Sequence, residues 1–129
     1  MSSPSAEEAG SLSAFTVCVI GALLSLGFFM FDSGHYIDTY LRTSGVAENA
    51  ARIGAQSVTG IRAGSPRVDH RLASNQAREY LRVEEFSGTV RASGSRVTVT
   101  VTAIWSPRLM RVIGDRRIVV TRTAEVIDQ

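Results

Sequence analysis

One uncharged stretch near the start constrains this chain of 129 residues more than any other feature. Residues 12–31 read LSAFTVCVIGALLSLGFFMF, and eleven of these twenty are Leu, Ile, Val or Phe. A helix of that length is about 30 Å long, the thickness of a bilayer's hydrocarbon core. The large apolar side chains favour insertion by several kcal/mol in total, and the interspersed Ser, Thr and Gly offset part of it. The sequence predicts a transmembrane helix over residues 11–31.

A cleavable secretory signal is the main alternative to a permanent membrane helix. Such signals begin with a basic region and end at a small-x-small cleavage site. The first ten residues, MSSPSAEEAG, contain two glutamates and no Lys or Arg, and residues 32–36 offer no Ala-x-Ala site. These features favour a helix that stays attached. The alternative of a secreted domain of about 100 residues requires cleavage near Asp32.

The basic residues leave the orientation of the helix open. All 14 basic side chains are arginines, and the first of them is Arg42. Basic residues near a membrane helix mark its cytoplasmic side, but a folded domain of about a hundred residues is translocated largely regardless of its charge. Neither orientation is excluded by the residues themselves.

Residues 32–129 predict one α+β domain. Residues 32–60 are predicted to continue the first helix, with an expected interruption at Asp32-Ser33-Gly34, and residues 61–66 form a connector. Ser65 as N-cap and Pro66 in the first turn predict a second helix that ends near Arg82.

The pattern then changes to a period of two. Residues 86–92, 96–105 and 117–127 predict three antiparallel strands, with a tight turn at residues 93–95. In the middle strand valines alternate with threonines, which indicates one buried and one wet face. The predicted fold is therefore a long N-terminal helix, a second helix and a three-stranded antiparallel meander.

Small side chains recur at helical spacing in the first helix. In lipid, small residues let helix backbones approach closely, so they are candidates for packing against other helices. The alternative is that alanine and glycine are simply common in membrane helices. The candidates are Ala14, Cys18, Gly21, Ala22 and Ser25 in the membrane and Ala47, Ala51 and Ala55 beyond it.

Other residues are candidates for contacts with the membrane or with partners. The amphipathic rings of His35, Tyr36 and Tyr40 suit the membrane–water interface. Residues 107–113, PRLMRVI, follow Trp105 and carry four large apolar side chains that cap the core, bind a partner or touch the bilayer. Core capping is the favoured interpretation, and Trp105, Leu109 and Met110 are the candidate partner contacts.

No motif points to an enzyme, a cofactor or a metal. Glycine patterns for nucleotides and the nucleophile elbow are missing, and the single cysteine, Cys18, lies in the apolar run. His35 and His70 lack acidic or thiol companions at ligand spacing. Asp32 and Asp38 are interpreted as solvated helix flank. The arginines are dispersed, which favours a solvated surface over a specific nucleic-acid site.

The order of these features resembles the TadE/TadG-like minor pseudopilins of tight-adherence (Flp, type IVc) pili. The resemblance rests on a polar leader that ends at Gly10, a hydrophobic helix that begins at Ser11, a small-residue helix ENAARIGA at residues 48–55, and a Val-Thr strand followed by Pro107. It covers nearly the whole chain and is one of pattern and order.

The resemblance implies a single-pass protein of the cytoplasmic membrane, with residues 1–10 as a cytoplasmic leader and residues 32–129 outside. It implies a structural role in pilus assembly, with the bilayer, other pilins or pseudopilins and inner-membrane platform proteins as partners. It also implies prepilin peptidase, which cuts after a glycine that corresponds to Gly10, although Phe15 stands where prepilins usually carry Glu. The alternative function is a membrane-tethered binding or accessory domain.

Overall fold

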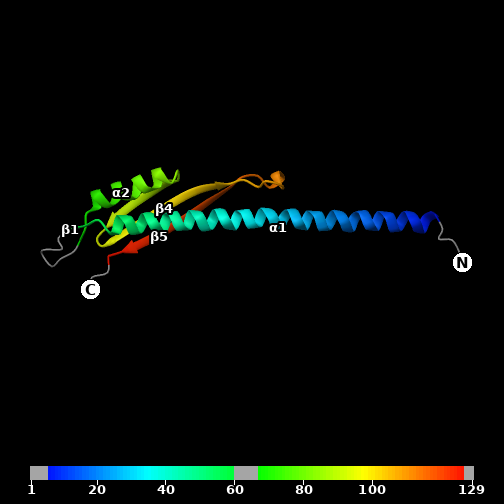
Figure 1. The fold of residues 1–129 in the computed structure, drawn as a ribbon, viewed down its shortest axis with the longest axis horizontal. Coiled ribbons are helices and arrows are strands. Elements are labelled where there is room, and N and C mark those ends of the chain that lie inside the picture. The colour runs from blue at the N-terminus through cyan, green and yellow to red at the C-terminus, as the bar shows by residue number, and fades with distance from the viewer. Residues whose placement is uncertain (1–5, 60–66, 127–129) are drawn as a thin grey trace.

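The computed structural model describes residues 6–59 and 67–126. Its longest element is α1 (Ala6–Ala55), whose 50 residues give a length of about 75 Å. The other elements are β1 (Val58–Thr59), β2 (Arg67–Val68), α2 (His70–Val83), β3 (Ser87–Ser93), β4 (Arg96–Trp105), the 3-10 turn η2 (Arg111–Ile113) and β5 (Arg116–Glu125). Figure 1 shows that α2 and the larger sheet lie beside the C-terminal half of α1, while its N-terminal half extends alone.

The first helix is continuous, so the expected break at Asp32-Ser33-Gly34 is wrong. No proline lies within α1 to remove a hydrogen bond. An aspartate can compete for helix backbone groups, but the Asp32 carboxylate binds backbone N–H groups of a distant loop instead. The helix also begins at Ala6, before the expected start at Ser11.

The second helix is shorter than expected at its N-terminus. It begins at His70, and its N-cap is Asp69, not Ser65; Ser65 and Pro66 lie outside the described residues. Asp69 Oδ1 accepts hydrogen bonds from the backbone N–H groups of Arg71 and Leu72, each 3.1 Å long. This carboxylate satisfies donors that the first turn leaves free.

The three-stranded antiparallel sheet is confirmed, in the order β3-β4-β5. β3 and β4 are joined by a tight turn in which Gly94 has a φ of 60°, a value that favours glycine. The valines of β4, Val97, Val99 and Val101, are fully buried, so the alternation of Val and Thr correctly predicted the inner face. β1 and β2 form a separate two-stranded pair that the sequence analysis did not predict.

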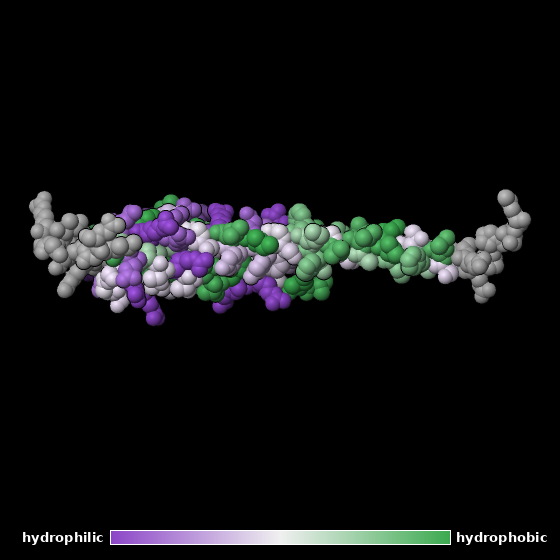
Figure 2. All heavy atoms as spheres, turned by 90° about the horizontal axis from the view of Figure 1, so that it is seen from below, coloured by the Kyte–Doolittle hydropathy of each residue, from purple (hydrophilic) through white to green (hydrophobic). Residues whose placement is uncertain are grey.

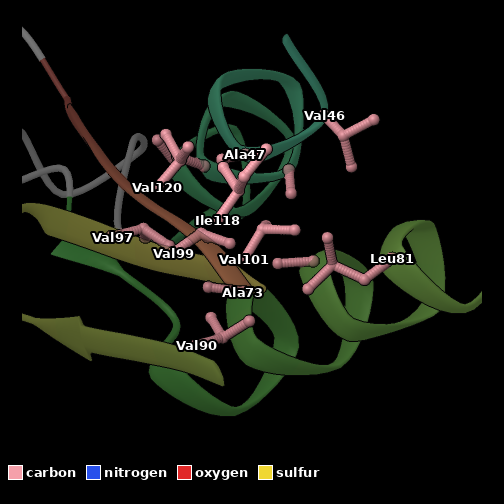
Figure 3. Packing of buried hydrophobic residues seen from close by; sticks show 14 of the residues in the cluster. Val46, Ala47, Ala73, Leu81, Val90, Val97, Val99, Val101, Ile118 and Val120 are labelled. Carbon is pink, nitrogen blue, oxygen red and sulfur yellow. The ribbon is translucent and has the colours of Figure 1, made fainter. Parts of the chain in front are cut away.

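The core lies between this inner face and both helices (Figure 3). α1 covers β4 and β5, and α2 lies beside α1 and packs on β3. The approach of α1 is close at Gly54, where an added Cβ would lie 2.9 Å from Val97 Cγ1 and 3.3 Å from the Ala73 carbonyl oxygen. Only glycine fits there without a shift of the neighbours.

The outer face of the sheet is covered by neither helix. Threonine hydroxyls pair across β4 and β5 at 2.9 Å, Thr98 with Thr123 and Thr100 with Thr121. Such cross-strand pairs stabilise a wet face by fractions of a kcal/mol each.

Candidate functional site

The N-terminal half of α1 is exposed along its length, and it meets the rest of the chain near Phe29, which lines a cavity with Trp105 and Ile113. Every residue from 10 to 31 is exposed, and Figure 2 shows a predominantly apolar surface along this half. The helix is long and apolar enough to cross a membrane. The core helix of a soluble protein has the same length and composition but is mostly buried, whereas none of this apolar stretch is. Its length, composition and exposure make this half of α1 a candidate membrane span.

The small side chains of this half lie open along the helix. Ala14, Cys18, Gly21, Ala22 and Ser25 are all exposed, and an added Cβ at Gly21 would meet nothing within 4 Å. Ser25 Oγ donates to the Gly21 carbonyl oxygen at 2.8 Å, which satisfies the hydroxyl inside the helix, as lipid requires. This face is free for a neighbouring helix.

The three alanines in the C-terminal half of α1 have a different role from the one expected. Ala47, Ala51 and Ala55 are between 0% and 8% exposed and belong to the chain's own core. Their small side chains let α1 lie close to α2 and the sheet. The expectation that they continue a packing face toward other subunits is therefore wrong.

Asp32 joins the exposed half of α1 to the folded domain. It is the first residue after the uncharged run, and it is 2% exposed. Its Oδ1 accepts the backbone N–H of Arg108 at 3.0 Å, and its Oδ2 accepts that of Met110 at 2.7 Å. The N–H of Leu109 lies 3.2 and 3.3 Å from the two oxygens. One carboxylate thus fixes three successive peptides of the β4–β5 loop to the helix.

These contacts determine the ionisation of the carboxyl. Burial by itself raises the pKa of Asp32, but the N–H groups of Met110, Leu109 and Arg108, together with nearby His35, outweigh it. They hold the pKa below its ordinary value of 3.8. The carboxylate is therefore charged near neutral pH.

Of the aromatic side chains expected at the membrane surface or at a partner, His35, Tyr36 and Tyr40 are at least partly exposed, whereas Trp105 is buried. Tyr36 is 39% exposed and packs edge-on against Trp105, with ring centroids 5.4 Å apart and planes at 87°. Tyr40 is also 39% exposed, and His35 is half-buried. Trp105 is 6% exposed, so it belongs to the core and is wrong as a partner contact. Its indole Nε1 finds no hydrogen-bond partner among the described residues.

The β4–β5 loop, residues 106–115, does not cap the core as expected. Val112 is fully exposed, Leu109 is 49% exposed, and Met110 is partly exposed. Pro107 is buried, but most of the apolar side chains of the loop face outward. Between the loop and α1 lies an apolar cavity of about 250 Å³, lined by Phe29, Asp32, Ser33, Tyr36, Ile37, Trp105 and Ile113.

The candidate processing site lies inside regular structure. Gly10 and Ser11 are both within α1 and exposed, so the peptide bond between them is helical. Among residues 6–59 and 67–126, no group of three or more His, Cys, Asp or Glu is placed to hold a metal ion.

The interpretation of Asp32 as solvated helix flank is wrong. Its carboxylate is buried against a loop that lies 76 to 78 residues further along the chain. The one available signal was its position, since it is the first charge after twenty uncharged residues. Nothing in residues 106–115 identifies them as its partner before the sheet is assembled.

Comparisons of the chain with known proteins find no relative. No protein-family model, no curated protein and no solved structure matches the chain significantly. Function must be inferred from the residues and their arrangement.

Proposed function

We propose that the chain is a non-enzymatic assembly subunit, a minor pseudopilin of a tight-adherence Flp pilus or a related secretion machine. In this proposal α1 crosses the cytoplasmic membrane, the N-terminus is cytoplasmic, and the domain lies outside. One observation carries the proposal: a single helix is bare and apolar in its first half and is built into a small α+β domain in its second. The resemblance to TadE/TadG-like pseudopilins supports the identity of the machine.

The bare half supplies a surface suited to assembly. Hydrophobicity does not drive helices together in lipid, so association depends on close packing of small residues and on van der Waals contact. The exposed face with Ala14, Cys18 and Ala22 offers such packing to pilins, pseudopilins or platform proteins.

The rest of α1 links this surface to the domain. The helix is continuous through residue 32, and Asp32 fixes the β4–β5 loop to it. A rotation or tilt imposed on the membrane half is therefore transmitted to the domain. A rigid connection of this kind suits a subunit that must be placed in a defined orientation within an assembly.

The test adds bulk to the packing face. Ala22→Leu and Cys18→Leu are each expressed in the native host, and co-isolation with crosslinked pilus platform proteins is measured. Both variants should reach the membrane normally but lose most of the crosslinked complex, because leucine keeps the backbones apart.

The matched control is Gly27→Leu. Gly27 is as open as Gly21, with nothing within 4 Å of an added Cβ, and it lies on the opposite side of the helix at 3.6 residues per turn. The same bulk there should leave the crosslinks intact. Crosslinks that survive Ala22→Leu and Cys18→Leu would show that this face is not the interface, and wild-type protein that never co-isolates with pilus components would reject the pilus proposal.

The alternative function, a membrane-tethered binding or accessory domain, has one observation in its favour. An open hollow of about 810 Å³ lies beside the β4–β5 loop, lined by His35, Ile104, Ser106, Pro107, Arg108, Arg111 and Asp115. Deletion of the gene separates the two functions, since a normally piliated deletion strain supports the alternative.

A further inference from the structure

The position of the β4–β5 loop along α1 is fixed by Asp32. The loop, orange in Figure 1, lies at the end of the domain nearest the bare half of α1. Asp32 directly follows the uncharged run, and its carboxylate holds the backbone N–H groups of Arg108, Leu109 and Met110. If residues 11–31 cross the membrane, as the proposed function requires, this loop lies at the level of the bilayer surface.

The loop exposes apolar side chains at this level. Val112 is 101% exposed, Leu109 is 49% exposed and Ile113 is 38% exposed. They lie on or just before the turn η2; the described residues leave Val112 uncovered and cover Leu109 and Ile113 only in part. A cluster of this kind is costly in water and favourable at the boundary between headgroups and acyl chains.

The charges around the loop are mostly positive. Arg108 and Arg111 line the hollow of about 810 Å³ together with His35, and Asp115 is the only acidic residue in that lining. Arg116 and Arg117 follow at the start of β5. The net positive charge complements the phosphates of anionic lipids, while long arginine stems can cover apolar surface.

We propose that the β4–β5 loop docks on an anionic bilayer surface. Leu109, Val112 and Ile113 insert into the headgroup region, and Arg108 and Arg111 bind lipid phosphates. The domain is then held against the membrane at two points, the α1 span and this loop, which fixes its tilt relative to the bilayer. Continuity with the membrane-spanning half of α1 favours lipid over a protein as the occupant.

The test measures the depth of the loop in a bilayer. The full-length chain carries Cys18→Ala and Val112→Cys, and an environment-sensitive fluorophore is attached to the new thiol. It is reconstituted into vesicles of phosphatidylcholine and phosphatidylglycerol in equal amounts, with brominated acyl chains as quenchers. The label at Val112 should show blue-shifted emission and lose fluorescence to the brominated lipid.

A matched label reports the other end of the domain. Ser93 is exposed and is the last residue of β3, at the end of the sheet farthest from the β4–β5 loop. A label on Ser93→Cys should therefore show neither the blue shift nor the quenching. A label on the native Cys18 reports the span separately. If the label at Cys18 is quenched but the label at Val112 behaves like the one at Ser93, the loop does not dock on the bilayer. The membrane span of α1 would then still hold. No quenching at Cys18 would overturn the span and the docking together.

The lipid charge is tested with the same label. Arg108→Gln with Arg111→Gln should reduce the quenching at Val112, and so should vesicles of phosphatidylcholine alone. Arg91→Gln, an exposed arginine of β3, is the matched control and should change nothing. Quenching that is independent of both lipid charge and these arginines would contradict the anionic surface. Burial of the label in native membranes but not in vesicles would assign the loop to a protein partner and overturn the proposal.

Discussion

The two halves of α1 have the same backbone and opposite surroundings. Residues 10–31 are exposed throughout, whereas the second half places Ala47, Ala50 and Ala51 at 0% to 1% exposure. Both halves contain small side chains at similar spacing. The difference shows that spacing alone does not identify the partner of a helix face. In the second half the chain supplies its own sheet and α2, and in the first half no described part of the chain covers the helix.

The largest difference in stability should appear when a leucine replaces one glycine in each half of α1. Gly54→Leu forces new atoms into a site where even a Cβ would lie 2.9 Å from Val97 Cγ1, while Gly27→Leu meets nothing within 4 Å. Both variants also gain helix propensity, and the gain is smaller at Gly54, the penultimate residue of α1, than at Gly27 in its interior. Overpacking should lower the free energy of unfolding of the Gly54 variant by about 1–3 kcal/mol relative to the Gly27 variant.

Thermal unfolding in detergent, followed by circular dichroism of the sheet, measures this difference. Equal stability of the two variants would mean that α1 does not pack on β4 at Gly54.

The junction between the halves should depend on the Asp32 carboxylate. In Asp32→Asn, the amide group keeps one oxygen but presents N–H donors to the backbone N–H groups of Arg108 and Met110, which also donate. The β4–β5 loop should therefore separate from the helix. Faster amide hydrogen exchange at residues 108–110 measures the loss, and Asp38→Asn, at an exposed position, is the control. Unchanged exchange would remove Asp32 as the link.

Acid should break the same link without a mutation. The pKa of Asp32 is lowered in the folded state, so its contribution to stability is complete above the unfolded-state value, at about pH 4. The contribution is lost as the pH falls through the lower folded-state value. Amide protection at residues 108–110 should hold from neutral pH to about pH 4 and then decline. A decline that begins near pH 6 would show that the Asp32 carboxylate does not control the protection of the loop.

The smallest effect should come from the solvent side of the second half. Glu48 and Arg52 form an ion pair at i and i+4, with side chains 48% and 66% exposed. Glu48→Gln should cost only about 0.3–0.5 kcal/mol, and less at high salt. The same unfolding assay measures it. A loss of unfolding free energy as large as that of Gly54→Leu would show that the face with Glu48 and Arg52 is not exposed to solvent.

The sequence predicted the elements better than their contacts. The Val-Thr alternation of residues 96–105 correctly identified the middle strand and its buried face, and the uncharged run correctly identified a long apolar helix. These signals are local periodicities, so they survive in a single sequence. The break at Asp32-Ser33-Gly34 was wrong because a turn-forming trio inside a helix is overridden when its aspartate binds elsewhere.

The remaining errors concern partners that lie far away in the chain. Asp32 and the β4–β5 loop, and Ala47 and the sheet, come together only in the assembled fold. Trp105 and Leu109 were interpreted together as candidate partner contacts, whereas the fold buries the indole and exposes Leu109. Adjacent residues can be separated in this way at the end of a strand, where the chain leaves the sheet.

A nitroxide scan along α1 in lipid vesicles tests the central claim most directly. Single cysteines from residue 10 to residue 55, in a Cys18→Ala background, are compared for accessibility to oxygen and to a water-soluble relaxation agent. The account predicts high oxygen accessibility along residues 12–31 and a change to water accessibility or burial from residue 32. It also predicts that accessibility varies with the period of one continuous helix through residues 32–34. Water access throughout residues 12–31, or a loss of the helical period at Asp32-Ser33-Gly34, would contradict it.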